Sequence, residues 1–386
     1  MALVELGSIL HFEKGKKPIS QSDSPADGFL PYVDIEAFET GKIKQYTDGT
    51  KCTPCDDGDI LIVCDGSRSG LVGRAVKGYV GSTLAKISAD CLSDQYLFHF
   101  VQGKYALLNT KKKGTGTPHL NQELLKQQKL IVPSYSEQER IVARIEELFS
   151  QLDAGVETLK KTKAQLAVYR QAVLKEAFEG DYPRKRLKEF SKAISGFAFK
   201  SSRYSPDGNY VVVKIGNVKE RHFDFSRDLT KTLEADDSIL EKYLLRRGDC
   251  LITLTGSRGK RDYGFVAMVG NQNNYLLNQR VAALRFDQSV ALPEFFQYYL
   301  ASPSYRDMFF GYETGNVGQG NVGIKALLDP YVILPDIDTQ KRIVEDVEDR
   351  LSVCDSIEQT VDTALKQAEA MRQSILKDAF EGRLLE

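Results

Sequence analysis

The sequence predicts an α+β fold in which two mixed α/β domains alternate with two long helices that pair as an antiparallel coiled coil. Three observations predict this class: a long sequence repeat, a heptad pattern within each copy of that repeat, and a shorter motif that recurs upstream of each copy. The chain has 386 residues, of which 42% are hydrophobic and 27% charged, so it is long enough to bury two hydrophobic cores.

The repeat is clearest where RQAVLKEAFEG (170–180) returns as RQSILKDAFEG (372–382). A shift of 202 positions aligns residues 133–180 with 335–382 without a gap, and 18 of those 48 pairs are identical. Further upstream, GDILIVCDGSR (58–68) matches GDCLITLTGSR (248–258), and Gly15 aligns with Gly196. Two long copies, rather than many short ones, indicate a pseudo-twofold internal repeat.

The repeat divides the chain into four segments. Residues 1–132 and 183–334 are predicted to form the two mixed α/β domains, and residues 133–182 and 335–386 the two long helices. Within the domains we expect strands at YVDIEAF (32–38), GDILIVCD (58–65) and VVVKIGNV (211–218), and a helix at ALPEFFQYYLAS (291–302).

Apolar residues at intervals of seven define the contact seam of each long helix. The seam residues are Ile145, Leu152, Leu159, Leu166 and Val173 in the first helix, and Val347, Cys354, Val361, Ala368 and Ile375 in the second. An adjoining stripe is expected at Ile141, Leu148 and Tyr169, and at Ile343, Ile357, Ala364 and Met371. This spacing is typical of a coiled coil, and the partner that we expect for each helix is the other copy.

Each long helix also carries start and stop signals. The expected N-caps are Ser136 and Asp338, and the expected C-caps are Gly180 and Gly382. A helix over residues 137–178 would be roughly 63 Å long at 1.5 Å per residue. If the two helices pair antiparallel, as a pseudo-twofold axis requires, the domains are expected at opposite ends of the pair and at a set distance from each other.

Charge is distributed unevenly, although the whole chain has a net charge of only −1. The net charge is +1 for residues 1–132, −1 for 133–180, +5 for 181–334 and −6 for 335–386. Basic domains suit the phosphates of a nucleic acid, whereas acidic helices would be repelled by a duplex or face a basic protein partner. The alternative is that the helices are charged only for solubility.

Basic and amide residues in predicted turns are the candidate DNA contacts. They are Ser67, Arg68, Arg74, Lys111, Lys112, Lys113 and Thr115 in the first domain, and Ser257, Arg258, Lys260, Arg261 and Gln319 in the second. Arg68 and Arg74 are expected in one loop. Lysine suits phosphates, whereas arginine can also bind the major-groove edge of guanine through two hydrogen bonds. The GSR motifs could equally be hairpin turns with a surface arginine, and the lysine run a solvated loop.

One further stretch leaves both readings open. NQNNYLLNQR (271–280) is rich in the amide side chains that bind adenine, but it also fits a loop that enters a strand.

The sequence favours neither a metal site nor a catalytic site. Cys52 and Cys55 have CxxC spacing, but no second such pair exists, so the six cysteines are interpreted as ordinary thiols. GQGNVG (318–323) fits GxGxxG, yet no clean apolar strand precedes it and Pro330 interrupts the segment after it, which argues against a dinucleotide site. The histidines show no ligand or triad spacing. With no long apolar span and no leader pattern, we expect a cytoplasmic protein without membrane contact.

Together these motifs resemble the specificity subunit of type I restriction-modification systems. The resemblance rests on P-x4-Q-x-R-I-V at the start of each long helix, Q-x-x-L-K-x-A-F-E-G at its end, and GDxLIxxxGSR within each domain, and it covers essentially the whole chain. It implies two target recognition domains, each of which reads one half of a split, asymmetric DNA sequence. It also implies that the helices set the spacer and dock two modification subunits.

The same resemblance implies which partners carry the chemistry. The modification subunits would bring S-adenosylmethionine and methylate adenine, and a separate motor and nuclease subunit would complete the restriction complex. This chain would then be a non-catalytic subunit with no cofactor of its own. Two other classes stay open: a self-sufficient methyltransferase, and a coiled-coil scaffold with non-specific DNA affinity and no role in methylation.

Overall fold

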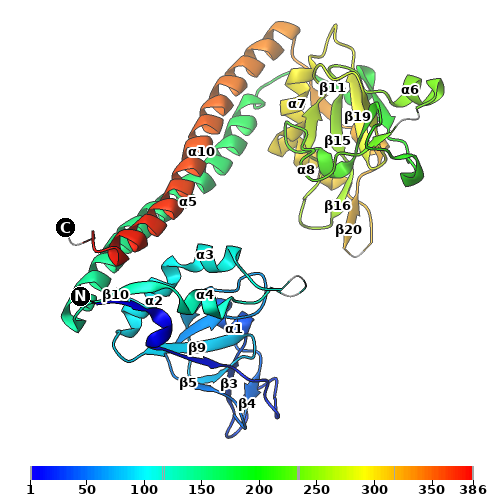
Figure 1. Cartoon of the computed structure of the whole chain (residues 1–386). Helices are drawn as coiled ribbons and strands as arrows, with labels where there is room; N and C mark the ends of the chain where they lie inside the picture. Colours follow the sequence, from blue (N-terminus) through cyan, green and yellow to red (C-terminus); the bar gives the residue numbers. More distant parts are fainter. Residues whose placement is uncertain (1, 115, 117, 233–234, 317, 385–386) are drawn as a thin grey trace. The chain divides into compact units, whose positions relative to one another are not determined.

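The computed structural model of the chain describes residues 2–114, 116, 118–232, 235–316 and 318–384. The chain divides into two compact units: the first unit is Met1–Lys160 with Asp362–Glu386, and the second unit is Lys161–Val361. Each unit contains sheets, short helices and one stretch of each long helix (Figure 1). Across the described residues, no helix is both long and apolar enough to cross a membrane.

The described part of the first unit is built on two four-stranded sheets. One sheet is antiparallel, in the order β2 (Leu10–Lys14), β9 (Leu84–Ala89), β6 (Ile60–Val63) and β7 (Val72–Arg74). The other has the order β4 (Tyr46–Thr47), β3 (Leu30–Val33), β8 (Gly78–Val80) and β5 (Pro54–Cys55), and its β3 and β8 are parallel. The remaining elements are β1 (Ala2–Glu5), which pairs with β10 (Lys129–Val132), and helices α1 (Ile35–Thr40), α2 (Asp94–Gly103), α3 (Tyr105–Thr110) and α4 (Gln122–Lys126).

The second unit repeats this topology. Its antiparallel sheet has the order β12 (Ser191–Ser195), β19 (Val281–Phe286), β15 (Cys250–Thr253) and β17 (Val266–Met268). A second sheet has the order β14 (Lys231–Thr232), β13 (Tyr210–Val213) and β18 (Tyr275–Leu277), and its β13 and β18 are again parallel. The remaining elements are the pairs β11 (Arg184–Arg186) with β21 (Tyr331–Ile333) and β16 (Thr255–Ser257) with β20 (Gln319–Asn321), and helices α6 (Asp237–Tyr243), α7 (Pro293–Ala301), α8 (Pro303–Gly311) and α9 (Ile324–Leu328). The predicted internal repeat is therefore confirmed at the level of strand order.

The predicted elements of the domains are only partly correct. The strand in GDILIVCD is β6, and the helix in ALPEFFQYYLAS is α7. In YVDIEAF, however, the strand ends at Val33, because the Asp34 carboxylate accepts a hydrogen bond from Ala37 N (2.8 Å) and so caps helix α1. In VVVKIGNV, likewise, the strand ends at Val213 and a 3-10 turn occupies Ile215–Asn217.

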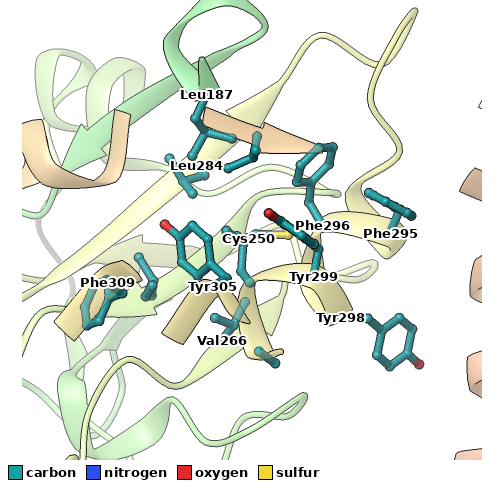
Figure 2. Close-up of a cluster of buried hydrophobic side chains, with 14 of the residues drawn as sticks. Leu187, Cys250, Val266, Leu284, Phe295, Phe296, Tyr298, Tyr299, Tyr305 and Phe309 are labelled. Carbon is teal, nitrogen blue, oxygen red and sulfur yellow. The ribbon is translucent and has the colours of Figure 1, made fainter. Parts of the chain in front are cut away.

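Aromatic side chains dominate the core of the second unit. Figure 2 shows Phe296, Tyr299 and Tyr305 around the buried Cys250, between the antiparallel sheet and helices α7 and α8. Phe178, at the end of the first long helix, packs edge-on against Phe295 and Tyr299, with ring centroids 5.3 Å apart in both pairs. The helix end is thereby anchored in the core of the unit.

The first unit anchors the end of the other long helix in the same way. Phe380 packs edge-on against Tyr96 (5.1 Å between centroids) and Phe100 (5.2 Å) on helix α2. Phe178 and Phe380 are an identical pair of the sequence repeat. Each unit is thus completed by the terminal phenylalanine of one long helix.

The two long helices are α5 (Tyr135–Ala177) and α10 (Ile337–Phe380). Both begin earlier than predicted, because Ser134 and Asp336 are the N-caps rather than Ser136 and Asp338. The Glu137 carboxylate accepts a hydrogen bond from Ser134 N (3.0 Å), and Thr339 N donates to Asp336 Oδ1 (2.9 Å). In each case the N-cap directly follows the proline, Pro133 or Pro335, so no separate turn precedes the helix.

The C-terminal ends of the two helices differ. At the end of α10, Gly382 has φ +84° and Arg383 N donates to Asp378 O (2.9 Å), as in a Schellman motif. After α5 the chain closes with shorter-range bonds from Phe178 N to Lys175 O and from Glu179 N to Glu176 O, and Gly180 is not left-handed. The glycine cap predicted at Gly382 is confirmed, and that at Gly180 is wrong.

The long helices run antiparallel within each unit (Figure 1). In the second unit, Arg170 pairs with Asp355 (2.7 Å) and Glu176 with Arg350 (2.8 Å), so positions rise on one helix as they fall on the other. In the first unit, Asp153 pairs with Arg372, and Ile145 and Phe149 pack with Leu376 and Ala379. The pairs Arg170–Asp355 and Arg372–Asp153 are related by the sequence repeat, which confirms the predicted antiparallel pairing.

The predicted seam residues lie on the inner side of the helices, but the adjoining stripe is shifted. The seam residues Leu152, Leu159 and Ile375 are half-buried, and the others are buried, namely Ile145, Leu166, Val173, Val347, Cys354, Val361 and Ala368. Of the stripe expected beside them, Tyr169, Ile357 and Met371 are exposed. Phe149 and Leu351, each four residues after a seam position, are buried in their place.

A buried glutamine joins each long helix to its unit. Gln340, fully buried, accepts from Leu292 N (2.8 Å) and donates to Val290 O (2.8 Å) and Pro335 O (2.7 Å). Its repeat partner Gln138, also fully buried, accepts from Ser93 N and donates to Cys91 O and Pro133 O. The same glutamine in both copies of the repeat therefore forms the same hydrogen-bonded clamp, which joins the start of the long helix to the loop before α2 or α7.

Replacing Gln340 by leucine is expected to destabilise the second unit by roughly 1–3 kcal/mol, because a leucine of similar shape leaves buried backbone groups without hydrogen bonds. Thermal unfolding followed by circular dichroism measures the loss. Gln165→Leu is the matched control, since Gln165 lies on an exposed face of α5 in the same unit. Equal melting temperatures of the two variants would show that the clamp contributes little.

Candidate nucleic-acid interface

A two-stranded ribbon extends from the second unit beyond its antiparallel sheet (Figure 1). Its strands β16 and β20 pair with Ser257 opposite Gln319 and Thr255 opposite Asn321. Ser257 and Arg258, which lie about 60 positions before Gln319 in the chain, are therefore its neighbours in the structure.

The two arginines that follow β16 are held by acidic and carbonyl groups. Arg258 donates from Nη1 to Gly315 O (2.8 Å), and its Nε lies 3.9 Å from the Glu313 carboxylate. Arg261 pairs with Asp307 (3.0 Å) on α8 and lies over the ring of Phe310. Lys260 lies between them on the exposed turn, as the sequence predicted for the residues after a strand.

The first unit carries the counterpart of this ribbon. Asp65 and His119 form a bridge, as do Lys113 and His119, and Gly66 N donates to Pro118 O (2.8 Å). By the offsets of the repeat, Asp65 and His119 correspond to Thr255 and Asn321. The two units therefore present the same backbone feature with different side chains.

Five candidate residues of the first unit lie around this counterpart, namely Ser67, Arg68, Lys111, Lys112 and Lys113. Lys112 donates from Nζ to Ser67 O (2.8 Å), which joins the lysine run to the GSR turn. The Arg68 guanidinium pairs with Glu39 (2.6 Å) on helix α1. Lys113 pairs with Glu123 (3.0 Å), and Lys111 is exposed at the end of α3.

Two candidates do not join this group. The prediction that Arg74 shares a loop with Arg68 is wrong, because Arg74 lies in strand β7. There its guanidinium donates hydrogen bonds to Gly58 O (2.9 Å) and Gln95 Oε1 and lies over the ring of Phe98. Its side chain joins β7 to helix α2, because the strand places it on the helix side of the sheet. Thr115 lies outside the described residues.

Sequence reasoning missed a polar network at the base of the first ribbon. Asp65 lies 2.7 Å from His119 Nδ1 and 3.0 Å from Lys14 Nζ. Burial raises the pKa of the Asp65 carboxyl, but hydrogen bonds from His119 and Lys14 outweigh that effect and hold its pKa below the ordinary value. The available signal was that Asp65 immediately precedes the GSR motif and that His119 aligns with Asn321 in the repeat.

The cysteines in the described part of the chain are free thiols. Burial raises the pKa of Cys55 to about 11 and that of Cys64 to about 12, so both thiols stay protonated at neutral pH. Within the described ranges, no group of three or more histidine, cysteine, aspartate or glutamate side chains is arranged to hold a metal ion.

Comparison with known proteins relates this architecture to one family. The chain matches the type I restriction modification DNA specificity domain twice, over residues 1–167 and 179–367. It is 25% identical to the type I restriction enzyme MjaVIII specificity subunit of Methanocaldococcus jannaschii over 405 residues, 99% of this chain and 92% of that protein. It is 28% identical to the EcoKI specificity subunit of Escherichia coli K12 over 272 residues, 66% of this chain and 57% of that protein.

Solved structures share the fold over the whole chain. One, from a study of complex assembly and conformational transition of the type I R-M system, has a TM-score of 0.75 at 20% identity and covers 99% of this chain and 98% of its own. The HsdS subunit of Thermoanaerobacter tengcongensis has a TM-score of 0.54 at 19% identity, with 99% and 97% covered. Since the two family matches fall on the two copies of the repeat and together span most of the sequence, the chain belongs to the type I restriction-modification DNA specificity family.

Proposed function

We propose that this chain is the sequence-specific DNA-binding subunit of a type I restriction-modification complex, and that each unit reads one half of a bipartite, asymmetric target. The observation that carries the proposal is the pair of equivalent ribbons. The backbone is repeated in both units, whereas the side chains on it differ: Asp65 and His119 in the first unit, Thr255 and Asn321 in the second. Two units with the same backbone at this position but different side chains would recognise two different half-sites.

The paired helices supply the spacing in this proposal. Helices of 43 and 44 residues are each about 65 Å long, which matches the length of about 19 base pairs. An antiparallel pair would set one separation between the half-sites and leave the bases between them unread.

The chemistry is assigned to the partners. Two modification subunits would dock on the acidic helices, bind S-adenosylmethionine and methylate the DNA, and a restriction subunit would add translocation and cleavage. This chain is proposed to be non-catalytic, in keeping with its family.

Methylome sequencing of cells that express this chain with its modification subunit tests the proposal. The expected result is one methylated, split and non-palindromic motif. The purified chain alone should transfer no methyl group from labelled S-adenosylmethionine to DNA, and transfer would identify a self-sufficient enzyme instead. If the complex methylates no bipartite motif and binds random duplex at neither low nor moderate salt, the chain is a protein scaffold.

Arginine at the GSR turn provides a residue-level prediction. Arg68→Ala and Arg258→Ala are each expected to weaken binding to the methylated motif by about 1–3 kcal/mol, the usual value of a bidentate contact with guanine, and to weaken random-DNA binding less. Titration of both duplexes at one salt concentration measures the difference. An equal loss on the two duplexes would identify these arginines as phosphate contacts.

A further inference from the structure

An open groove of about 540 Å³ lies in the second unit beside the ribbon. It is bounded by β16 and β20 and by the turn between β18 and β19. The polar residues that line it are Thr255, Gln279, Arg280, Asn316, Gln319 and Asn321. Gln319 is one of the candidate DNA contacts, and Gln279 and Arg280 belong to the stretch 271–280, for which the sequence left both a base-binding and a loop reading open.

Arg280 is the cationic residue that lines this groove, and its guanidinium is free to bind a ligand. Its side chain is exposed, and within the described residues no group hydrogen-bonds to or pairs with its guanidinium. The nearby Arg258 and Arg261, by contrast, are bound to Gly315 O and Asp307. A guanidinium with its five donors unused is available to a ligand.

The backbone at Arg280 is strained. Its φ of +69° lies in the left-handed region that favours glycine, yet a long basic side chain occupies the position. The carbonyl of Arg280 accepts a hydrogen bond from Leu254 N (2.9 Å), which holds the residue next to the start of β16. Strain that the surrounding structure maintains is common at binding sites, because it fixes the direction of a functional side chain.

Amide groups surround this cation. The Thr255 hydroxyl donates to Asn321 Oδ1 (3.2 Å), which fixes the orientation of that amide and leaves its NH₂ group for a ligand. Gln279 precedes Arg280, and Gln319 lies across the groove on β20. Arginine binds guanine O6 and N7 through two hydrogen bonds, and glutamine or asparagine binds adenine N6 and N7 in the same way, so this set has the chemistry of base-edge recognition.

The first unit has the same frame but a different surface. Cys64 N donates to Thr83 O (2.8 Å) as Leu254 N does to Arg280 O, so Thr83 is the counterpart of Arg280. The counterparts of Thr255 and Asn321 are Asp65 and His119, and Asp65 pairs with both His119 (2.7 Å) and Lys14 (3.0 Å). No cation corresponds to Arg280 at this position of the first unit, which is the difference expected if this surface distinguishes the two half-sites.

We propose that this groove reads the base edges of the half-site bound by the second unit, and that Arg280 binds a guanine there from the major groove. Gln279, Gln319 and Asn321 contact the neighbouring bases. The inference rests on the proposed DNA-binding function and adds residues outside the GSR motif to those that determine the specificity of this half-site.

The test compares Arg280→Ala and Arg280→Gly with wild type in the full chain expressed with its modification subunit. Methylome sequencing should report a motif relaxed at one G·C pair of one half-site, with the other half-site unchanged. Titration of purified complex with the wild-type duplex should show about 5- to 150-fold weaker binding, the range for one bidentate base contact, and little change on random duplex. Arg280→Gly should melt no lower than wild type, because glycine adopts φ +69° without strain.

Two control variants locate the effect. Arg247→Ala removes another exposed arginine of the same unit, on the turn before β15, whereas the groove lies past the end of that strand, about 13 Å farther on. It should change neither the motif nor the affinity. His119→Asn, in the first unit, should leave the half-site relaxed by Arg280→Ala unchanged.

The outcomes separate this inference from the proposed function. If the wild-type complex methylates no bipartite motif, the proposed function fails. If wild type does so but Arg280→Ala keeps the same motif, relaxes both half-sites, or loses the same affinity for specific and random duplex, the assignment of Arg280 is overturned while the proposed function stands.

Discussion

Replacing Gly196 by alanine is expected to destabilise the second unit by about 3 kcal/mol or more, the upper end for overpacking. A Cβ at this position would lie far inside van der Waals distance of the Asn278 carbonyl oxygen. Only backbone could move to relieve the clash, and that backbone is held by Gly196 N to Val281 O and Gln279 N to Phe197 O. For a unit of about 200 residues the melting temperature should fall by about 6–12 °C.

Gly323→Ala is the matched control for this variant. Gly323 belongs to the same unit, has φ −75°, and would place its Cβ more than 4 Å from any neighbour outside its own chain segment. Circular dichroism with limited proteolysis identifies which unit unfolds first. Equal melting temperatures of the two alanine variants would show that the backbone beside Gly196 can move to accommodate a Cβ without loss of stability.

The repeat makes the same prediction for the first unit. A Cβ at Gly15 would meet the carbonyl oxygens of Val80 and Gly81, and Gly15 N donates to Leu84 O just as Gly196 N donates to Val281 O. The sequence match of Gly15 with Gly196 therefore has a structural reason: in each unit, the glycine lets two backbone segments approach closely at the same place.

Arg285→Met is expected to destabilise the second unit by about 3–5 kcal/mol, because it leaves a buried carboxylate without its charged partner. Asp249 is 1% exposed, and Arg285 donates to both of its oxygens at 2.7 Å. The Asp249 carboxylate also accepts from Arg246 N (2.8 Å), so it shapes the turn before β15. Thermal unfolding of the variant should show a fall of about 6–20 °C.

The first unit contains a natural comparison. Asp59, the equivalent of Asp249, pairs with Lys86 (3.0 Å), which lies on β9 two residues before the counterpart of Arg285, and both side chains are about one quarter exposed. Lys86→Met should therefore cost about 1 kcal/mol or less, as for solvent-exposed ion pairs. If it costs as much as Arg285→Met, burial is not the cause. Adding Asp249→Asn to Arg285→Met should recover part of the loss, since the neutral amide can still accept from Arg246 N.

These contacts explain the role of the GDxLIxxxGSR motif. Gly58 and Gly248 have φ +89° and +85°, so the glycine makes the turn and the aspartate after it caps that turn. The first half of the motif is thus structural, and only its GSR end reaches the candidate interface. The sequence match alone could not separate the two halves, because both are equally well repeated.

Local patterns in the sequence were sufficient for the long helices. A heptad spacing is a property of consecutive residues, so the existence, length and mutual pairing of α5 and α10 follow from residues such as Ile145, Val173 and Val347. Their caps and the flanking stripe were less well predicted, because Ser134 competes with Ser136 for the cap and because packing, not spacing alone, buries Phe149 and exposes Tyr169.

By itself, the sequence determined that the chain is duplicated, that two long helices pair, that each copy has its own mixed α/β unit, and which family the motifs resemble. Only the tertiary structure decided which polar residues share a surface. Lys14, Asp65 and His119 are brought together from three separate segments, Arg280 is placed beside Asn321, and Arg74 is turned towards helix α2. The physical reason is that helical periodicity is encoded in near neighbours, whereas a binding surface depends on strand pairing between residues far apart in the chain.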